Sequence, residues 1–152
     1  TLLGTGGALG KALPLLGPEF FVLYGDSFLP VSFPTVEQAY YDSDLPGLMT
    51  VYRNEGEWDT SNVAFKNGSV LEYNKAKPQH DMAYIDYGLG VLSKSVVEHY
   101  RQEQVCDLAT VYEALANARQ LAGFEVFERF YEIGSPDGLA QTEEYLRSKV
   151  SL

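Results

Sequence analysis

A run of five apolar residues, Phe20-Phe21-Val22-Leu23-Tyr24, stops at Gly25-Asp26 and constrains the fold more than any other segment. An apolar run of this length that ends at a turn signal predicts a strand buried on both faces, and such strands belong to parallel sheets. Within 63–71, Asn67-Gly68 can supply the positive φ angles of a tight turn, so this segment predicts a β-hairpin. Further strands are expected over 48–53, 84–92 and 124–131.

Helical patterns alternate with these strands, which predicts a single α/β domain over 1–152, with three layers around a mostly parallel sheet. Each helix has a recognisable start: a glycine-rich entry at Gly4, Pro34 in a first turn, Asp107 as a cap, and Ser135-Pro136 as cap and first residue. The last two helices carry apolar residues on one face. These residues are Leu108, Val111, Tyr112, Leu115 and Ala118 in the third helix, and Leu139, Leu146 and Val150 in the fourth.

The composition excludes several classes of function. The chain has a net charge of −10 and is 45% apolar, so it can bury a core but offers no general surface for nucleic-acid phosphates. Its apolar runs are far shorter than the roughly 18 residues of a membrane span, so we expect no membrane insertion. Cys106 is the only cysteine, which excludes an intramolecular disulfide, and with two histidines a zinc site is not expected. A cytoplasmic location is the expectation.

Glycines dominate the entry to the first expected helix, in Leu3-Gly4-Thr5-Gly6-Gly7-Ala8-Leu9. Glycines at a helix start let a ligand approach the backbone, whose free N–H groups attract anions or carbonyl oxygens. The segment does not match the dinucleotide fingerprint, because Leu9 stands where the third glycine belongs and no strand precedes it. From the residues alone, a flexible turn and a ligand-binding loop are both open.

Acidic residues stand at the ends of two expected strands. Asp26 follows the first apolar run, and Glu132 lies just before the last helix, 132 − 26 = 106 positions further on. Ligands of open α/β sheets bind beyond the carboxyl ends of the strands, and Mg²⁺ prefers oxygen ligands. Each acid alone could cap a turn or a helix, whereas the pair could share one metal ion.

Two more segments contain residues that could contact a phosphate or a sugar. Lys75 or Lys77 could pair with a phosphate as a point charge, or both could lie in a solvated loop. In Tyr84-Ile85-Asp86-Tyr87-Gly88, a carboxylate and two aromatic rings could hold sugar hydroxyls, or the segment could be a half-buried strand with ordinary tyrosines.

In this order, the segments resemble those of the sugar-1-phosphate nucleotidyltransferase family. The glycine segment is similar to the family's base- and sugar-contacting loop, and 21–26 to its strand that ends in a magnesium-binding aspartate. Asn74-Lys75-Ala76-Lys77-Pro78 lies where many members carry Glu-Lys-Pro, and Glu132-Ile133-Gly134-Ser135-Pro136 where many carry Asp-Ile-Gly-Thr-Pro. Trp58-Asp59-Thr60-Ser61-Asn62-Val63, together with 84–88, is most similar to the branch that acts on mannose or mannoheptose 1-phosphate with GTP.

The resemblance implies an N-terminally truncated, Rossmann-like nucleotidyltransferase fold and a Mg²⁺-dependent enzyme. In the family, a sugar-phosphate oxygen attacks the α-phosphorus of a nucleoside triphosphate, and pyrophosphate leaves. Asp26 and Glu132 would hold Mg²⁺, and Lys75 or Lys77 would hold the attacking phosphate. The implied nucleotide- and sugar-binding residues are Gly4, Thr5, Gly6, Gly7, Ala8, Asn62, Asp86, Tyr87 and Gly88.

One departure from the family bears on activity. Members begin with a strand and a glycine-rich loop that carries a catalytic arginine, whereas this chain begins at Thr1 and resembles the C-terminal two-thirds of the domain. We therefore expect little turnover from the chain alone, and association between copies as a way to cover exposed surface.

Two other functions stay open. One is a non-catalytic or vestigial module that binds a sugar phosphate or a nucleotide sugar. The other is a glycosyltransferase, although Asp42-Ser43-Asp44, the chain's Asp-x-Asp pair, lies at the end of an expected helix rather than after a strand.

Overall fold

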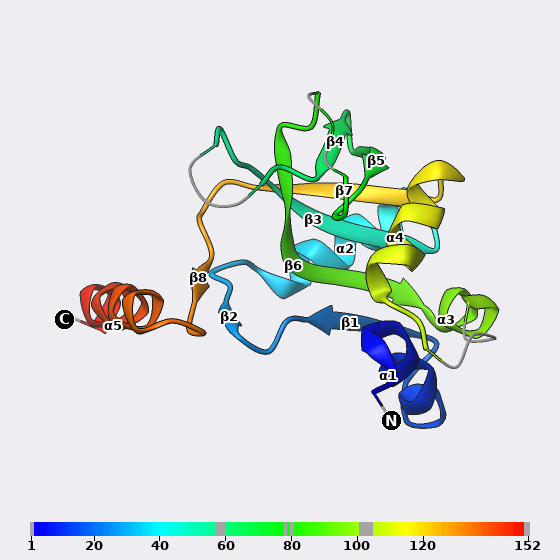
Figure 1. The fold of residues 1–152 in the computed structure, drawn as a ribbon, viewed down its shortest axis with the longest axis horizontal. Helices are drawn as coiled ribbons and strands as arrows, with labels where there is room; N and C mark the ends of the chain where they lie inside the picture. Colours follow the sequence, from blue (N-terminus) through cyan, green and yellow to red (C-terminus); the bar gives the residue numbers. More distant parts are fainter. Residues whose placement is uncertain (1, 57–59, 78, 80, 101–104, 151–152) are drawn as a thin grey trace.

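The computed structural model of the chain describes residues 2–56, 60–77, 79, 81–100 and 105–150. In this part, helices pack against both faces of a central sheet, so the expected three layers are present (Figure 1).

A six-stranded sheet in the order β1-β6-β3-β7-β5-β4 forms the centre of the described part. Its strands are β1 (Glu19–Leu23), β3 (Gly47–Arg53), β4 (Val63–Lys66), β5 (Ser69–Tyr73), β6 (Tyr84–Ser93) and β7 (Leu121–Val126). Because β4 also pairs with β6, through Val63 and Tyr84, five strands close into a barrel-like ring and β1 lies outside it. Two short strands, β2 (Ser27–Phe28) and β8 (Tyr131–Glu132), form a separate antiparallel pair.

The prediction of a mostly parallel sheet is wrong. Within the described residues only β3 and β7 pair in parallel, and every other pairing in the sheet is antiparallel. The difference arises at β6, which lies between β1 and β3 and runs opposite to both. β6 is apolar along most of its length because helices cover both faces of the sheet there, and a strand covered in this way has no alternating pattern whatever its direction.

The first strand is also less buried than its sequence predicts. β1 pairs only with β6 among the described strands, and Phe21 and Leu23 are 36% and 49% exposed. The alternate residues Phe20, Val22 and Tyr24 pack against the core. β1 is therefore an edge strand with one covered face.

Helices from distant parts of the chain cover one face of the sheet (Figure 1). They are α1 (Gly4–Ala12), the 3₁₀ turn η1 (Leu13–Leu15), α3 (Lys94–Tyr100) and α4 (Leu108–Asn117). The apolar stripe of α4 is buried as predicted, except for Ala118, which lies beyond the end of the helix. On the other face, α2 (Phe33–Ser43) packs Val36 and Tyr40 into a second core.

The last helix, α5 (Pro136–Val150), extends away from the body of the molecule in Figure 1. Its apolar residues Leu139 and Leu146 are 56% and 42% exposed. Among its described residues only Gly138 and Thr142 are buried, and α5 packs on β8 and through the Tyr145 ring on Phe28 and Tyr131.

Candidate functional site

Two adjoining cavities lie at the end of β1 and share Tyr24, Tyr73 and Lys75 in their walls. The first, which we call the Asp86 cavity, has a volume of about 190 Å³. The second, the Asp26 cavity, has a volume of about 470 Å³. The Asp86 cavity is also lined by Ser27, Asn62, Ile85, Asp86, Tyr87, Gly88 and Phe130, and the Asp26 cavity by Thr5, Leu23, Gly25, Asp26, Asp107, Leu108 and Ala109.

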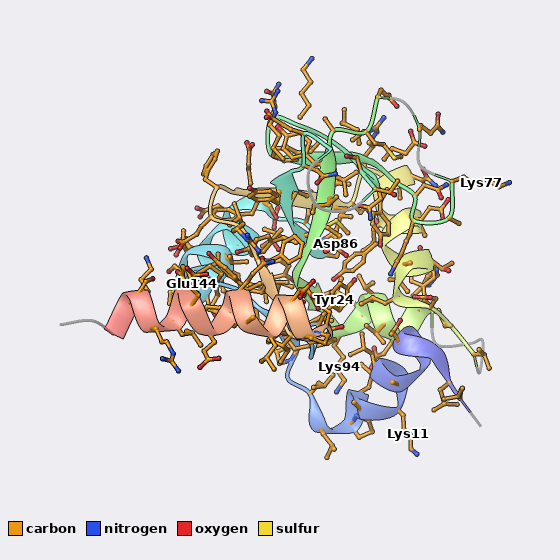
Figure 2. The ribbon with its side chains drawn as sticks, turned by 60° about the vertical axis from the view of Figure 1, so that its left-hand side comes forward. Lys11, Tyr24, Lys77, Asp86, Lys94 and Glu144 are labelled. Atoms are coloured by element: carbon orange, nitrogen blue, oxygen red, sulfur yellow. The ribbon has the colours of Figure 1, made fainter. Side chains whose placement is uncertain are left out.

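Asp86 is the acidic group of the first cavity, and its carboxylate is held on both oxygens. The Tyr24 hydroxyl donates to Oδ2 at 2.7 Å, and the Gly88 backbone N–H donates to Oδ1 at 2.9 Å. Figure 2 shows Asp86 and Tyr24 next to each other, on β6 and after β1. Burial raises the pKa of Asp86 above its ordinary value, and the hydrogen bonds from Tyr24 and Gly88 and the charge of Lys75 act against that rise.

The backbone around Asp86 is shaped by two of the predicted sugar-binding residues. The Asn62 side-chain oxygen accepts from the Asp86 backbone N–H at 3.1 Å, and Asn62 itself is 9% exposed. Gly88 has φ +95°, a backbone conformation that residues other than glycine rarely adopt. The sequence therefore places an asparagine and a glycine where they set the direction of the Asp86 side chain.

Tyr87 differs from its neighbours because its ring lies in the core. It is 2% exposed and packs among the residues under α2, with Phe130 at a ring distance of 6.0 Å. Its hydroxyl has no hydrogen-bond partner among the described groups. The residue borders the Asp86 cavity, but most of its ring serves packing rather than the wall of the cavity.

The two candidate lysines occupy different environments. Lys75 lines both cavities, whereas Lys77 lines neither. In Figure 2 the Lys77 side chain projects outward from the edge of the molecule, far from Asp86 and Tyr24. The Asn74 side-chain oxygen accepts from the backbone N–H groups of Ala76 and Lys77, at 3.1 and 2.8 Å, which forms the turn that separates the two lysines.

The glycine-rich segment is part of helix α1, and two of its glycines permit a close backbone contact. A Cβ atom at Gly4 would lie 2.5 Å from the Cys106 carbonyl oxygen, and one at Gly6 would lie 3.1 Å from the same atom. The Gly7 N–H donates to that oxygen at 3.1 Å. Packing of α1 on residue 106 thus accounts for these glycines, and of the predicted residues Gly4 to Ala8 only Thr5 lines the Asp26 cavity.

Thr5 and Asp107 join α1 to the start of α4 in the wall of the Asp26 cavity. The Thr5 hydroxyl donates to the Asp107 carboxylate at 2.9 Å and accepts from the Leu108 N–H at 2.9 Å. Asp107 also accepts from the Ala109 N–H at 3.0 Å, as a helix cap does. The hydrogen bonds from Ala109 and Thr5 hold the pKa of Asp107 below its ordinary value.

Asp26 and Glu132 are neighbours in the fold although 106 positions separate them. The Ile133 N–H donates to the Asp26 carbonyl at 2.8 Å, and Ser27 lies opposite Glu132 in the pairing of β2 with β8. Asp26 is exposed and lines its cavity, whereas Glu132 lines neither cavity. Whether the two carboxylates share a metal ion stays a prediction.

The Glu132 carboxylate has a structural partner at the start of α5. It accepts from the Ser135 hydroxyl and from the N–H groups of Gly134 and Ser135, the first of these N–H groups at 2.8 Å. These hydrogen bonds, led by the Ser135 hydroxyl, lower its pKa. Gly138 lets the carboxylate approach the first turn of α5, because a Cβ atom there would collide with Glu132.

The donor set around Asp26 is small. Among the described residues, no group of three or more His, Cys, Asp or Glu side chains is arranged to hold a metal ion. Mg²⁺ commonly uses one or two carboxylates together with water and substrate phosphates rather than a cage of protein ligands. Asp26 therefore fits a Mg²⁺ ion that arrives with a phosphorylated ligand.

Several other predicted features lie away from the cavities. Asp42-Ser43-Asp44 forms the end of α2, where Asp42 accepts from Gln38 at 2.8 Å and Asp44 has φ 53°, so it is a helix terminus rather than a ligand pair after a strand. Trp58-Asp59 and Pro78 lie outside the described residues. None of the helices in the described part combines the length and apolar character needed to cross a membrane.

Sequence reasoning missed Tyr24 as a member of the site. The sequence pattern indicates only that Tyr24 is the last apolar residue of a strand. Its position directly before Gly25-Asp26 nevertheless places it at a strand end, where ligands bind in α/β sheets. Asp107 was interpreted only as a cap. Tyr73 and Phe130 carried no local signal, because they reach the cavities through the antiparallel hairpin and the connection from β7 to β8.

The fold is shared with solved structures named as nucleotidyltransferases of phosphorylated sugars and polyols. A structure from Bacillus anthracis, assigned as a glucose-1-phosphate thymidylyltransferase and solved in complex with a sucrose, superposes with a TM-score of 0.81 at 12% identity, over 97% of this chain and 62% of that one. The inositol-1-phosphate CTP transferase from T. maritima gives a TM-score of 0.73 at 22% identity, over 97% and 62% of the two chains.

A third similar structure is HddC from Yersinia pseudotuberculosis complexed with GMP-PN, with a TM-score of 0.70 at 18% identity over 96% of this chain and 64% of that one. The chain thus spans somewhat less than two-thirds of the length of these structures. Neither a model of a known protein family nor a curated protein matches it in sequence.

Proposed function

We propose that the chain belongs to a nucleotidyltransferase that joins a nucleoside triphosphate, GTP by its resemblance, to a sugar 1-phosphate of the mannose or heptose type, in the cytoplasm and with Mg²⁺. The observation that supports this most is the arrangement of the two cavities. Lys75 stands between a carboxylate suited to sugar hydroxyls, Asp86, and a carboxylate suited to a metal ion, Asp26. The shared fold and the guanine nucleotide in the HddC complex agree with it.

In this proposal the chain acts by positioning and by neutralising charge. The sugar ring occupies the Asp86 cavity, where a carboxylate accepts from hydroxyls, and its phosphate meets the Lys75 ammonium. Asp26 and, by family position, Glu132 would hold Mg²⁺, which neutralises phosphate charge when bound. Lys75, rather than Lys77, is the proposed phosphate ligand because it borders both cavities.

The two lysines provide a matched test. Isothermal titration of the chain with mannose 1-phosphate and glucose 1-phosphate should give measurable binding, which Lys75→Ala weakens about ten-fold or more, since a charge-assisted pair is lost. Lys77→Ala removes the same charge from the same loop at a residue that lines neither cavity, so it should leave the affinity unchanged. The absence of binding to any hexose 1-phosphate, or equal effects of the two substitutions, would contradict the proposal.

A non-catalytic binding module is the second candidate. Among the described residues that line the cavities, Lys75 is the one basic side chain, so the chain as it stands offers little to hold a triphosphate. The test uses a form of the protein extended to the length of the solved structures. Binding of hexose 1-phosphate without release of pyrophosphate from any nucleoside triphosphate would favour this second function.

A further inference from the structure

Tyr24 is attached to the segment around Asp86 by two hydrogen bonds and a ring contact. Its backbone N–H donates to the Gly88 carbonyl at 3.1 Å, and its hydroxyl donates to Asp86 Oδ2 at 2.7 Å. Its ring lies against Gly88, where a Cβ atom would be 3.1 Å from the ring edge. The residue at the end of β1 thus fixes a residue on β6, 62 positions away.

Asp86 keeps capacity to accept further hydrogen bonds. A carboxylate offers about four acceptor positions, and the described structure uses one on each oxygen. The residue is half-buried and lines the cavity that Lys75 also borders. Asp86 and Lys75 together therefore match a ligand with hydroxyl groups that donate to the carboxylate and a nearby negative charge that pairs with the lysine.

Tyr24 also influences the ionisation of this carboxylate. Burial raises the pKa of Asp86, and the Tyr24 hydrogen bond is the largest of the interactions that lower it. The titratable groups that face Asp86 are Tyr24 at the end of β1, Tyr73 on β5, Lys75 after β5 and Tyr112 on α4. Lys75 is the one cation in this set, and the tyrosines stay neutral because burial raises their pKa values further.

We propose that Tyr24 is a positioning residue of the Asp86 cavity, which holds the Asp86 carboxylate as the acceptor for hydroxyl groups of a sugar ring whose phosphate meets Lys75. This inference rests on the proposed function for the identity of the ligand. Tyr24 acts through Asp86, so removal of its hydroxyl should weaken recognition of the sugar and leave recognition of the phosphate intact.

The test compares Tyr24→Phe, Asp86→Asn and the double variant by isothermal titration with mannose 1-phosphate, glucose 1-phosphate and inorganic phosphate, between about pH 5 and pH 9. Tyr145→Phe is the matched control, because the Tyr145 hydroxyl donates to the Glu128 carboxylate at 2.6 Å outside both cavities. Phenylalanine keeps the ring against Gly88, and thermal melting verifies that each variant is folded.

We expect Tyr24→Phe to weaken hexose 1-phosphate binding about ten-fold while affinity for inorganic phosphate stays constant. As the pH is lowered, Tyr24→Phe should lose hexose 1-phosphate binding at a higher pH than the wild type does. The reason is that Asp86 protonates more readily without the hydrogen bond from Tyr24. Asp86→Asn should remove this acid limb, and Tyr24→Phe should add no further loss in the Asp86→Asn background. Tyr145→Phe should resemble the wild type.

Titration of the Asp86 carboxyl carbon by ¹³C NMR, without ligand, distinguishes the positioning role of Tyr24 from the identity of the ligand. An Asp86 titration that Tyr24→Phe does not move, or a full effect of Tyr24→Phe in the Asp86→Asn background, would overturn the positioning role alone. A wild-type chain that binds no hexose 1-phosphate would overturn the proposed function and the sugar ligand named here, whatever the NMR titration shows.

Discussion

At the scale of single residues, one added methyl group at Gly88 should disturb the backbone beside Asp86. Alanine there meets two obstacles: a backbone at φ +95° and the Tyr24 ring 3.1 Å from the new Cβ. We expect Gly88→Ala to lower the free energy of unfolding by about 2 kcal/mol or more, measured by urea denaturation. Gly68→Ala is the control, because Gly68 has φ +76° in open space and should lose only about 1 kcal/mol. Equal losses would mean that the contact with Tyr24 has no cost.

The negative charge of Asp86 should lower the stability of the fold. Its pKa in the folded chain is raised by burial, so the native state binds more protons than the unfolded state above about pH 4. Stability therefore falls as the pH rises from the unfolded value through the folded one. Asp86→Asn, which can still accept from Gly88, should be more stable than the wild type at neutral pH and equal to it in acid. Urea denaturation over a pH series checks this, and a less stable Asn variant at neutral pH would contradict it.

Several residues singled out from the sequence line one cavity, whereas their roles in binding stay predictions. Asn62, Lys75, Asp86 and Gly88 border one cavity as expected, because each lies in or beside a strand whose pattern is readable. The contact of Tyr24 with Asp86 was not predictable, because a tyrosine at the end of an apolar run has the same sequence pattern whether its hydroxyl contacts water or a carboxylate. That difference depends on the register between β1 and β6, which no local pattern reports.

At the scale of elements, the junction between α1 and α4 depends on Asp107. This side chain caps α4 and accepts from Thr5, and its pKa is lowered by those hydrogen bonds. Asp107→Ala should cost about 1 kcal/mol of unfolding free energy at neutral pH, whereas Asp107→Asn, also a good cap, should cost less.

The pH dependence of this cap follows from the lowered pKa. The charged cap stabilises the fold fully above the unfolded pKa of about 3.9 and loses that contribution as the pH falls through the lower folded value. In Asp107→Asn, the contribution of this cap to the free energy of unfolding should not depend on pH. Urea denaturation of both variants at neutral pH and near pH 3 measures the difference, and a wild-type advantage that persists in acid would show that the charge is not involved.

Element types were predictable, but their directions were not. The strands at 48–53 and 84–92 appear nearly where expected, and the 63–71 hairpin forms around Asn67 and Gly68, with φ 51° and 76°. A strand covered on both faces looks the same in parallel and antiparallel sheets, so the pattern at 84–92 did not reveal that β6 runs opposite to both of its neighbours. α3 was missed, because Lys94–Tyr100 is only seven residues long and follows β6 without a break.

At the scale of the whole molecule, charge sets the difficulty of the proposed reaction. The chain carries −10, and its ligands would be polyanions. Among the described residues that line the two cavities, Lys75 alone is basic. In the proposed function Lys75 and Asp86 would hold the sugar phosphate, whereas stabilising a leaving pyrophosphate needs several donors arranged in advance.

We therefore expect the 152-residue chain to bind hexose 1-phosphates but to transfer a nucleotidyl group very slowly. Loss of even one preorganised donor to a developing anion commonly costs about a hundred-fold in rate, and the family's glycine-rich loop would contribute several such donors. The measurement is pyrophosphate release with Mg²⁺, GTP and mannose 1-phosphate, from this chain beside a form extended by a first strand and glycine-rich loop to the length of the solved structures. UTP, CTP and TTP in parallel reactions test the choice of base. Comparable turnover by the two forms would mean that Lys75, Asp26 and the surrounding backbone N–H groups suffice for catalysis.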